Sequence, residues 1–281
     1  MNAFWLVILV SLSIGLFIGF SFLQLEQRFG LQVKEEFAKH PLKTEEIMTE
    51  QDIAHLPAPV KRYLHYVGAV GKPMIQNFKL HFSAEMLKSP QDRPMKATSI
   101  QYNFTENPVR LFFMKARMLG LPVQVFHSYR EHAATMRVRL ASLYNAVDLS
   151  GEVLNETETV TLFNDFCFYA PTVLASDAVS FEEIDELSVK ASYRNGPYKI
   201  SAILYFNAEN QLVNFTSEDR SAGPQKDGSF RKIKFFTPVR DYQDFHGRKV
   251  ATYGEATWGY PEGDFVYGKF TVTNVEYNLR D

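Results

Sequence analysis

The feature that most constrains the fold is a change in the spacing of apolar residues near residue 77. Between Phe78 and Met86 every second residue is apolar, with polar or charged residues between them. A period of two is typical of a strand with one buried face. Further segments with strand character follow to the end of the chain: 99–105, 109–114, 123–130, 135–140, 187–193, 198–206, 211–217, 229–236, 249–259 and 265–277.

Short segments rich in Gly, Pro, Asn and Asp separate these predicted strands, for example Asn195-Gly196-Pro197 and Asp227-Gly228. Turn-forming residues in gaps of this length favour hairpins between antiparallel neighbours. No internal repeat and no linker divides the region. We therefore predict a mainly β (α+β) fold, in which residues 56–281 form a single domain around a large curved antiparallel sheet.

Two helices are expected to cover this sheet. Residues 56–68 carry apolar side chains at helical spacing, with Pro59 near the start and Gly68 just past the end. A second helix is predicted near 155–169, where Val160 and Phe163 begin an apolar stripe and Pro171 follows the last turn. A long antiparallel sheet needs such cover because its apolar face must be buried.

The first 25 residues contain no charged side chain, and residues 3–23 are almost wholly apolar. As a helix this stretch would reach about 32 Å, enough to cross a hydrocarbon core about 30 Å thick. A cleaved signal peptide would have basic residues before a shorter apolar run. In this sequence no basic residue precedes the apolar run, and the run is longer. We predict one uncleaved transmembrane helix at 1–25, followed by a solvated helical stalk at 26–55.

The side of the membrane on which the domain lies stays open. Basic residues follow the apolar stretch and none precedes it, which favours a cytoplasmic domain, but large domains are also translocated against this bias. The expected location is a single-pass protein of a bacterial inner membrane, and the basic residues concerned are Arg28, Lys34, Lys39 and Lys43.

Composition excludes several classes of protein. A single cysteine, Cys167, forbids an internal disulfide or a cysteine-based zinc site, and its aromatic neighbours suggest a buried, inert thiol. A net charge of −2 argues against a nucleic-acid partner. The sequence contains no phosphate-binding glycine loop, dinucleotide fingerprint, zinc-protease motif or nucleophile elbow. We therefore expect no cofactor and no metal ion.

Two groups of polar residues are candidates for a site. Glu158 and Asp165 share one face of the predicted helix, where paired carboxylates can act as acid and base or simply pair with an arginine of the sheet. Asp219 and Arg220 leave a predicted strand, and Arg117 is another internal arginine. Such an arginine can bind a carboxylate or phosphate headgroup with two hydrogen bonds, or it can close a buried ion pair.

Several segments resemble a bacterial family of uncharacterised, membrane-anchored proteins. They include residues 56–64 (LPAPVKRYL), 116–123 (ARMLGLPV), 158–165 (ETVTLFND) and 217–220 (SEDR), and the resemblance covers residues 50–281. It implies a domain of unknown function and no mechanism. The number of strands and the inserted helix also resemble lipoprotein carriers of the LolA/LolB type. This resemblance implies a half-barrel closed by helices and favours an extracytoplasmic domain.

These observations favour a membrane-anchored module that holds a lipid or another hydrophobic molecule in the half-barrel. The alternatives are a hydrolase or transferase acting on a lipid-like substrate, with Glu158, Asp165 or the Arg220 group in its site, and a structural subunit of an envelope complex. A further alternative is that the aromatic residues pack against one another in a solid core and leave no cavity for a ligand. The candidate pocket wall is Tyr63, Leu64, Phe82, Phe104, Phe112, Phe163, Phe166 and Trp258, with Arg117 and Arg220 as headgroup partners and Glu158, Asp165 and Asp219 as a polar site.

Overall fold

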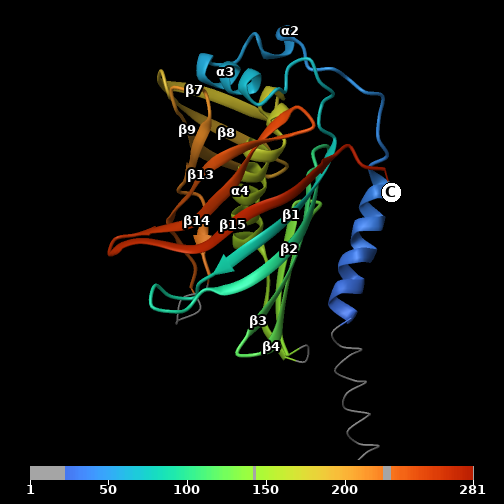
Figure 1. Ribbon diagram of the computed structural model, residues 1–281, viewed down its shortest axis with the longest axis vertical. Helices are drawn as coiled ribbons and strands as arrows, with labels where there is room; N and C mark the ends of the chain where they lie inside the picture. Colours follow the sequence, from blue (N-terminus) through green and yellow to red (C-terminus); the bar gives the residue numbers. More distant parts are fainter. Residues whose placement is uncertain (1–22, 142–143, 224–228, 281) are drawn as a thin grey trace, which may run out of the picture.

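One large antiparallel sheet dominates the structure (Figure 1), a computed structural model that describes residues 23–141, 144–223 and 229–280. Thirteen strands form the sheet in the order β6-β5-β4-β3-β2-β1-β15-β14-β13-β10-β9-β8-β7. The two end strands of this order, β6 and β7, do not pair with each other, so the sheet is open. The prediction of a mainly β, antiparallel fold is confirmed.

The strands are β1 (Asn77–Met86), β2 (Met95–Phe104), β3 (Val109–Met118), β4 (Leu121–Arg130), β5 (Ala133–Leu140), β6 (Tyr144–Ser150), β7 (Val179–Asp185), β8 (Ser188–Asn195), β9 (Tyr198–Phe206), β10 (Leu212–Ser217), β11 (Ser221–Ala222), β12 (Arg231–Lys232), β13 (Lys234–Phe245), β14 (Arg248–Tyr260) and β15 (Gly263–Tyr277). β11 and β12 form a separate two-stranded hairpin. The helices are α2 (Glu50–Ile53), α3 (Ala58–Tyr66), α4 (Glu152–Tyr169) and the 3₁₀ turn η1 (Pro171–Ala175). Residues 23–39 are also helical.

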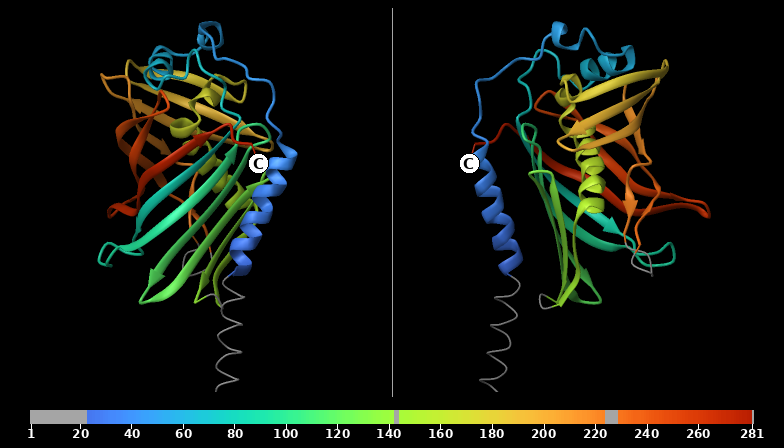
Figure 2. Two further views of the ribbon diagram at one scale, coloured as in Figure 1. Left: turned by 45° about the vertical axis from the view of Figure 1, so that its right-hand side comes forward. Right: turned by 180° about the vertical axis from the view of Figure 1, so that it is seen from behind.

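The sheet curves around α4, which lies against its concave face (Figures 1 and 2). Most side chains of α4 are buried, because strands of both halves of the sheet surround the helix. Phe163 stacks on Tyr193 of β8, with 4.7 Å between ring centroids. The main core therefore lies between α4 and the sheet.

α3 covers one end of this core. Tyr63 is fully buried, and its hydroxyl donates a hydrogen bond of 2.8 Å to the carbonyl oxygen of Cys167. Gly68 follows the helix with φ of +67°, and a Cβ atom there would lie 2.7 Å from the carbonyl oxygen of Gly247. Glycine is therefore required where the chain leaves α3.

The helical residues 23–39 lie on the opposite, convex face of the sheet (Figure 2). Leu25, Phe29 and Val33 are buried there against β2, β3 and β4, and Phe29 stacks on Phe113 at 5.2 Å. The prediction of a solvated helical stalk through residue 55 is wrong in two respects. The helix ends at residue 39, and one of its faces is buried because its apolar residues recur every four positions.

The predicted transmembrane helix falls mainly outside the described part of the chain, which begins at residue 23. Among the described residues, no helix combines the length and the apolar character needed to cross a bilayer.

The sheet contains two strands that the apolar pattern did not predict, β6 and β7. Both are edge strands whose side chains are mostly exposed, so alternation between buried and exposed positions is weak. β13 also begins later than expected, at Lys234, and runs through Pro238 to Phe245. Proline interrupts a strand pattern because it donates no hydrogen bond, which explains why the expected strand stopped at residue 236.

Candidate functional site

A cavity of about 380 Å³ lies between α4 and the concave face of the sheet. Most of the accessible surface that lines it is apolar, and its wall includes Phe82, Phe112, Met114 and Trp258. The sheet therefore encloses a hollow that its side chains do not fill.

Strand alternation places the side chains of β3 in this site. Arg110, Phe112 and Met114 point into the cavity, since the residues between them pack against the helical residues 23–39 on the other face. On a strand, successive side chains point to opposite faces. The alternation along β3 therefore places the charged side chain of Arg110 in the mostly apolar wall of the cavity.

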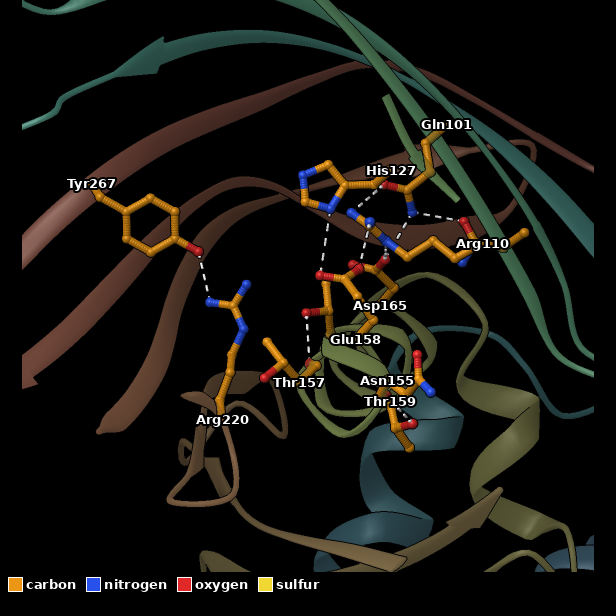
Figure 3. Close-up of polar contacts among 12 residues, drawn as sticks. Gln101, Arg110, His127, Asn155, Thr157, Glu158, Thr159, Asp165, Arg220 and Tyr267 are labelled. Atoms are coloured by element: carbon orange, nitrogen blue, oxygen red, sulfur yellow. Dashed lines mark hydrogen bonds and ion pairs between the residues drawn. The ribbon is translucent and has the colours of Figure 1, made fainter. Parts of the chain in front are cut away.

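Arg110 is the centre of a buried charged network that joins the sheet to α4 (Figure 3). Its Nε donates to Asp165 Oδ2 at 2.7 Å, its Nη1 to Glu158 Oε2 at 3.3 Å and its Nη2 to Gln101 Oε1 at 3.1 Å. Gln101 Nε2 also donates to Asp165 Oδ2 at 2.8 Å. Every nitrogen of this guanidinium therefore has a protein partner.

Glu158 is only 3% exposed and lies among several cationic or basic groups. His127 Nδ1 is 3.5 Å from its Oε1 atom, a distance typical of an ion pair but long for a hydrogen bond. Burial by itself raises the pKa of Glu158, but attraction to His127, Arg110 and Arg220 outweighs burial and lowers the pKa to about 2. This carboxyl group is ionised at neutral pH.

Asp165 differs from Glu158 although both contact Arg110. Burial raises the pKa of Asp165 above its ordinary value, and the charge of Arg110 and the hydrogen bonds from Arg110 and Gln101 offset only part of this effect. One cavity thus holds two carboxyl groups whose pKa values shift in opposite directions.

Arg220 is a second buried arginine in the same cavity, on the segment between β10 and β11. Its guanidinium carbon lies 4.1 Å from the ring centroid of Phe235, 4.9 Å from that of Trp258 and 5.9 Å from that of Tyr267. Its Nη1 donates to the Tyr267 hydroxyl at 2.8 Å. Ser221 N, next in the chain, donates to Thr157 Oγ1 at 3.2 Å, which ties this segment to α4.

The structure places the sequence-predicted site residues in five environments. Those that line the cavity are Phe82, Phe112, Glu158, Asp165, Arg220 and Trp258. Those that lie in the core away from it are Tyr63, Leu64, Phe163 and Phe166. Phe104 packs on the convex face, and Arg117 is exposed on β3. Asp219 accepts hydrogen bonds from the backbone and hydroxyl of Ser201 at 2.7 and 3.1 Å.

Sequence reasoning missed several polar residues of the site, among them Gln101, Arg110, His127 and Tyr267. The sequence did contain one indication that Arg110 belongs to a site, because this residue stands in an otherwise apolar stretch at the start of β3. A charged residue at such a position is rarely buried without a partner. Nothing in the local sequence of the other three indicates that they face the cavity.

Within the described ranges, no group of three or more His, Cys, Asp or Glu side chains is arranged to hold a metal ion. Cys167 is fully buried as a free thiol, and burial raises its pKa well above the ordinary value.

The sequence profile of a family of unknown function (DUF6544) matches residues 46–270. No curated protein matches this chain. Among solved structures, a DUF1329 family protein from Desulfovibrio piger is 12% identical, with a TM-score of 0.43, over 79% of this chain and 92% of that one. A LolA superfamily protein from Nitrosomonas europaea is 8% identical, with a TM-score of 0.42, over 78% of this chain and 94% of that one.

Proposed function

The chain belongs to a family of unknown function (DUF6544), and from the geometry of its cavity we propose that it binds a lipid or another hydrophobic molecule between α4 and the concave face of the sheet. The observation that carries this proposal is a cavity of about 380 Å³ whose lining is mostly apolar. Cavities that bind small molecules commonly have volumes of about 300–1,000 Å³ and a few polar groups in an apolar wall.

A solid core is the competing interpretation of so many aromatic residues, and the placement of the side chains argues against it. Phe163 and Phe166 fill the core beside α4, whereas Phe82 and Phe112 line open space. The side chains that line an open apolar space of this size lack van der Waals contacts that they would make in a filled core. A bound ligand is the simplest source of these contacts.

We also propose that the domain is tethered to a membrane by the apolar residues 1–25, with the β3–β4 hairpin facing the lipid. At the tip of that hairpin Leu119 is 98% exposed and Leu121 is 48% exposed. Lys115 Nζ donates to Glu26 Oε1 at 2.7 Å, so the beginning of the helical residues 23–39 lies beside this end of β3 (Figure 1). Exposed leucines at the end of the fold where the described chain begins suit a lipid surface.

The proposed binding is tested with the full chain held in a peptidisc without added lipid. N-phenyl-1-naphthylamine, an uncharged fluorescent probe, should bind and should be displaced by dodecanol. Val125→Trp, which puts a large side chain into the cavity, should weaken binding at least about tenfold. Val213→Trp is the matched control, because Val213 is a half-buried strand residue outside this cavity. Equal binding by both variants, or no binding by the wild type, would refute the proposal.

An enzyme acting on a lipid-like substrate is the second candidate, favoured by the opposite pKa shifts of Glu158 and Asp165. It ranks second because Arg110, Gln101 and His127 already occupy oxygens of these carboxylates. Hydrolysis of p-nitrophenyl dodecanoate tests it: an enzyme should lose turnover in Glu158→Gln or Asp165→Asn while its fold and probe binding remain. No turnover by the wild type would count against this candidate.

A further inference from the structure

We propose that the molecule bound in the cavity carries an anionic group, a carboxylate or a phosphate, and that the guanidinium of Arg220 binds this group. The inference rests on the proposed function, which it makes more specific: the ligand is an anionic amphiphile rather than a neutral hydrophobic molecule.

The hydrogen bonds of Arg220 are incomplete although its side chain is only 9% exposed. Nη1 donates to Tyr267, whereas Nε is buried and has no hydrogen-bond partner within the described residues. A guanidinium has five N–H donors, and leaving a buried one unused is costly. Arg110 in the same cavity differs, because protein oxygens occupy all three of its nitrogens.

The charge of Arg220 also lacks a direct partner. No carboxylate oxygen of the described residues lies within 4.0 Å of its guanidinium. Its attraction to Glu158 acts over a longer distance, and the oxygens of Glu158 are engaged by Arg110 and His127. A buried charge is normally paired, so the position of Arg220 favours a ligand that supplies the negative charge.

The surrounding rings hold the guanidinium in place. Phe235 and Trp258 lie within 5 Å of its central carbon, and Tyr267 anchors one nitrogen. A planar guanidinium packed against aromatic rings keeps a fixed orientation, in which the N–H groups that lack a protein partner can donate to a carboxylate or phosphate. Because most of the accessible surface of the cavity is apolar, we expect the anion to be attached to an apolar chain that occupies the remaining volume.

The test compares ligands that share a chain and differ in headgroup. The full chain in a peptidisc without added lipid is loaded with uncharged N-phenyl-1-naphthylamine, which is displaced by dodecanoate, dodecyl phosphate or dodecanol. The wild type should bind at least one of the two anions about tenfold more tightly than the alcohol, the gain typical of a hydrogen bond to a charged group. The tighter of the two anions identifies the headgroup as carboxylate or phosphate.

Two arginine variants complete the experiment. Arg220→Met keeps an unbranched side chain against Phe235 and should bring the anions to the affinity of dodecanol. Arg240→Met is the matched control, because Arg240 also lies over an aromatic ring, at 3.7 Å from the centroid of Tyr253, but outside the cavity; it should keep the preference for anions.

The outcomes separate this inference from the proposed function. If dodecanol binds the wild type as tightly as both anions, or if Arg220→Met retains the preference, the inference is wrong while the proposed function stands. If neither the probe nor any twelve-carbon ligand binds the wild type, the proposed function itself fails. The wild-type comparison needs no variant, so it remains decisive even if Arg220→Met does not fold.

Discussion

Arg110 on β3 and Asp165 on α4 form a buried ion pair, with 2.7 Å between Nε and Oδ2. The pair connects the sheet to the helix at the wall of the cavity, where Glu158 adds a second carboxylate to the same guanidinium. Charges removed from water are costly unless they are paired and hydrogen-bonded. This network therefore holds α4 against β3, and it tolerates little change in any one member.

We expect Arg110→Met to lower the free energy of unfolding by about 3–5 kcal/mol, because it leaves Glu158 and Asp165 buried without their cation. Urea denaturation followed by circular dichroism measures the difference. Arg240→Met is the control: that arginine is exposed and lies 3.7 Å from Asp241, so its loss should cost under about 1 kcal/mol. Equal losses for the two variants would mean that the buried network contributes no more than a surface pair.

Acid stability should depend on Glu158. Folding lowers the pKa of Glu158 from 4.5 to about 2, so its contribution to stability is complete above pH 4.5 and is lost as the pH falls from 4.5 to about 2. Asp165, whose pKa is raised, acts in the opposite direction. In Glu158→Gln the free energy of unfolding should change less steeply with pH over this range.

The control for this experiment is Glu182→Gln, which removes a negative charge at a side chain that is 75% exposed. Denaturation curves measured between pH 2 and pH 5 should keep the wild-type slope in Glu182→Gln. A wild-type slope in Glu158→Gln as well would show that the ion pairs of Glu158 do not govern acid unfolding.

Phe163 and Phe112 should respond differently to truncation. Phe163 stacks on Tyr193 in the core, so Phe163→Ala should lower the free energy of unfolding by about 3–5 kcal/mol while the folded protein still binds N-phenyl-1-naphthylamine. Phe112 lines the cavity, so Phe112→Ala should change the affinity for the probe. If Phe163→Ala changed probe affinity as much as Phe112→Ala, the core and the cavity would not be separate.

The β3–β4 hairpin should contact lipid when the full chain is reconstituted into vesicles. Because Cys167 is buried, a nitrobenzoxadiazole label attached to Leu119→Cys should mark that position alone. Its emission should shift to the blue, and lipids with a spin label should quench it. Ile184→Cys is the control, since Ile184 is an exposed apolar residue on β7, away from the hairpin (Figure 1). Identical emission at both positions would exclude a hairpin that faces the bilayer.

Local alternation predicted the buried face of β1 but not that of β2, where Ser99, Gln101 and Asn103 are more buried than Ile100 and Tyr102. In β1 the alternation from Phe78 to Met86 predicted a half-buried strand, and the strand spans Asn77–Met86. The helix predicted near 155–169 occupies Glu152–Tyr169. These features follow from side-chain spacing, because a strand repeats every two residues and a helix every 3.6.

The contacts of the site could not be predicted in this way. Glu158 meets Arg110 across 48 residues of sequence, and Tyr267 meets Arg220 across 47. Such contacts depend on strand order, above all on the pairing of β1 with β15, which joins the two halves of the sheet. A local period carries no information about which strands become neighbours.

The sequence by itself determined the class of fold and the positions of most strands and of the helix near residues 155–169, because each depends on the spacing of neighbouring residues. Only the tertiary structure decided which aromatic side chains fill the core and which line a cavity, and which arginine is fully paired. Those properties depend on the curvature of the sheet and on where α4 rests against it, and both arise from contacts between residues that are distant in the chain.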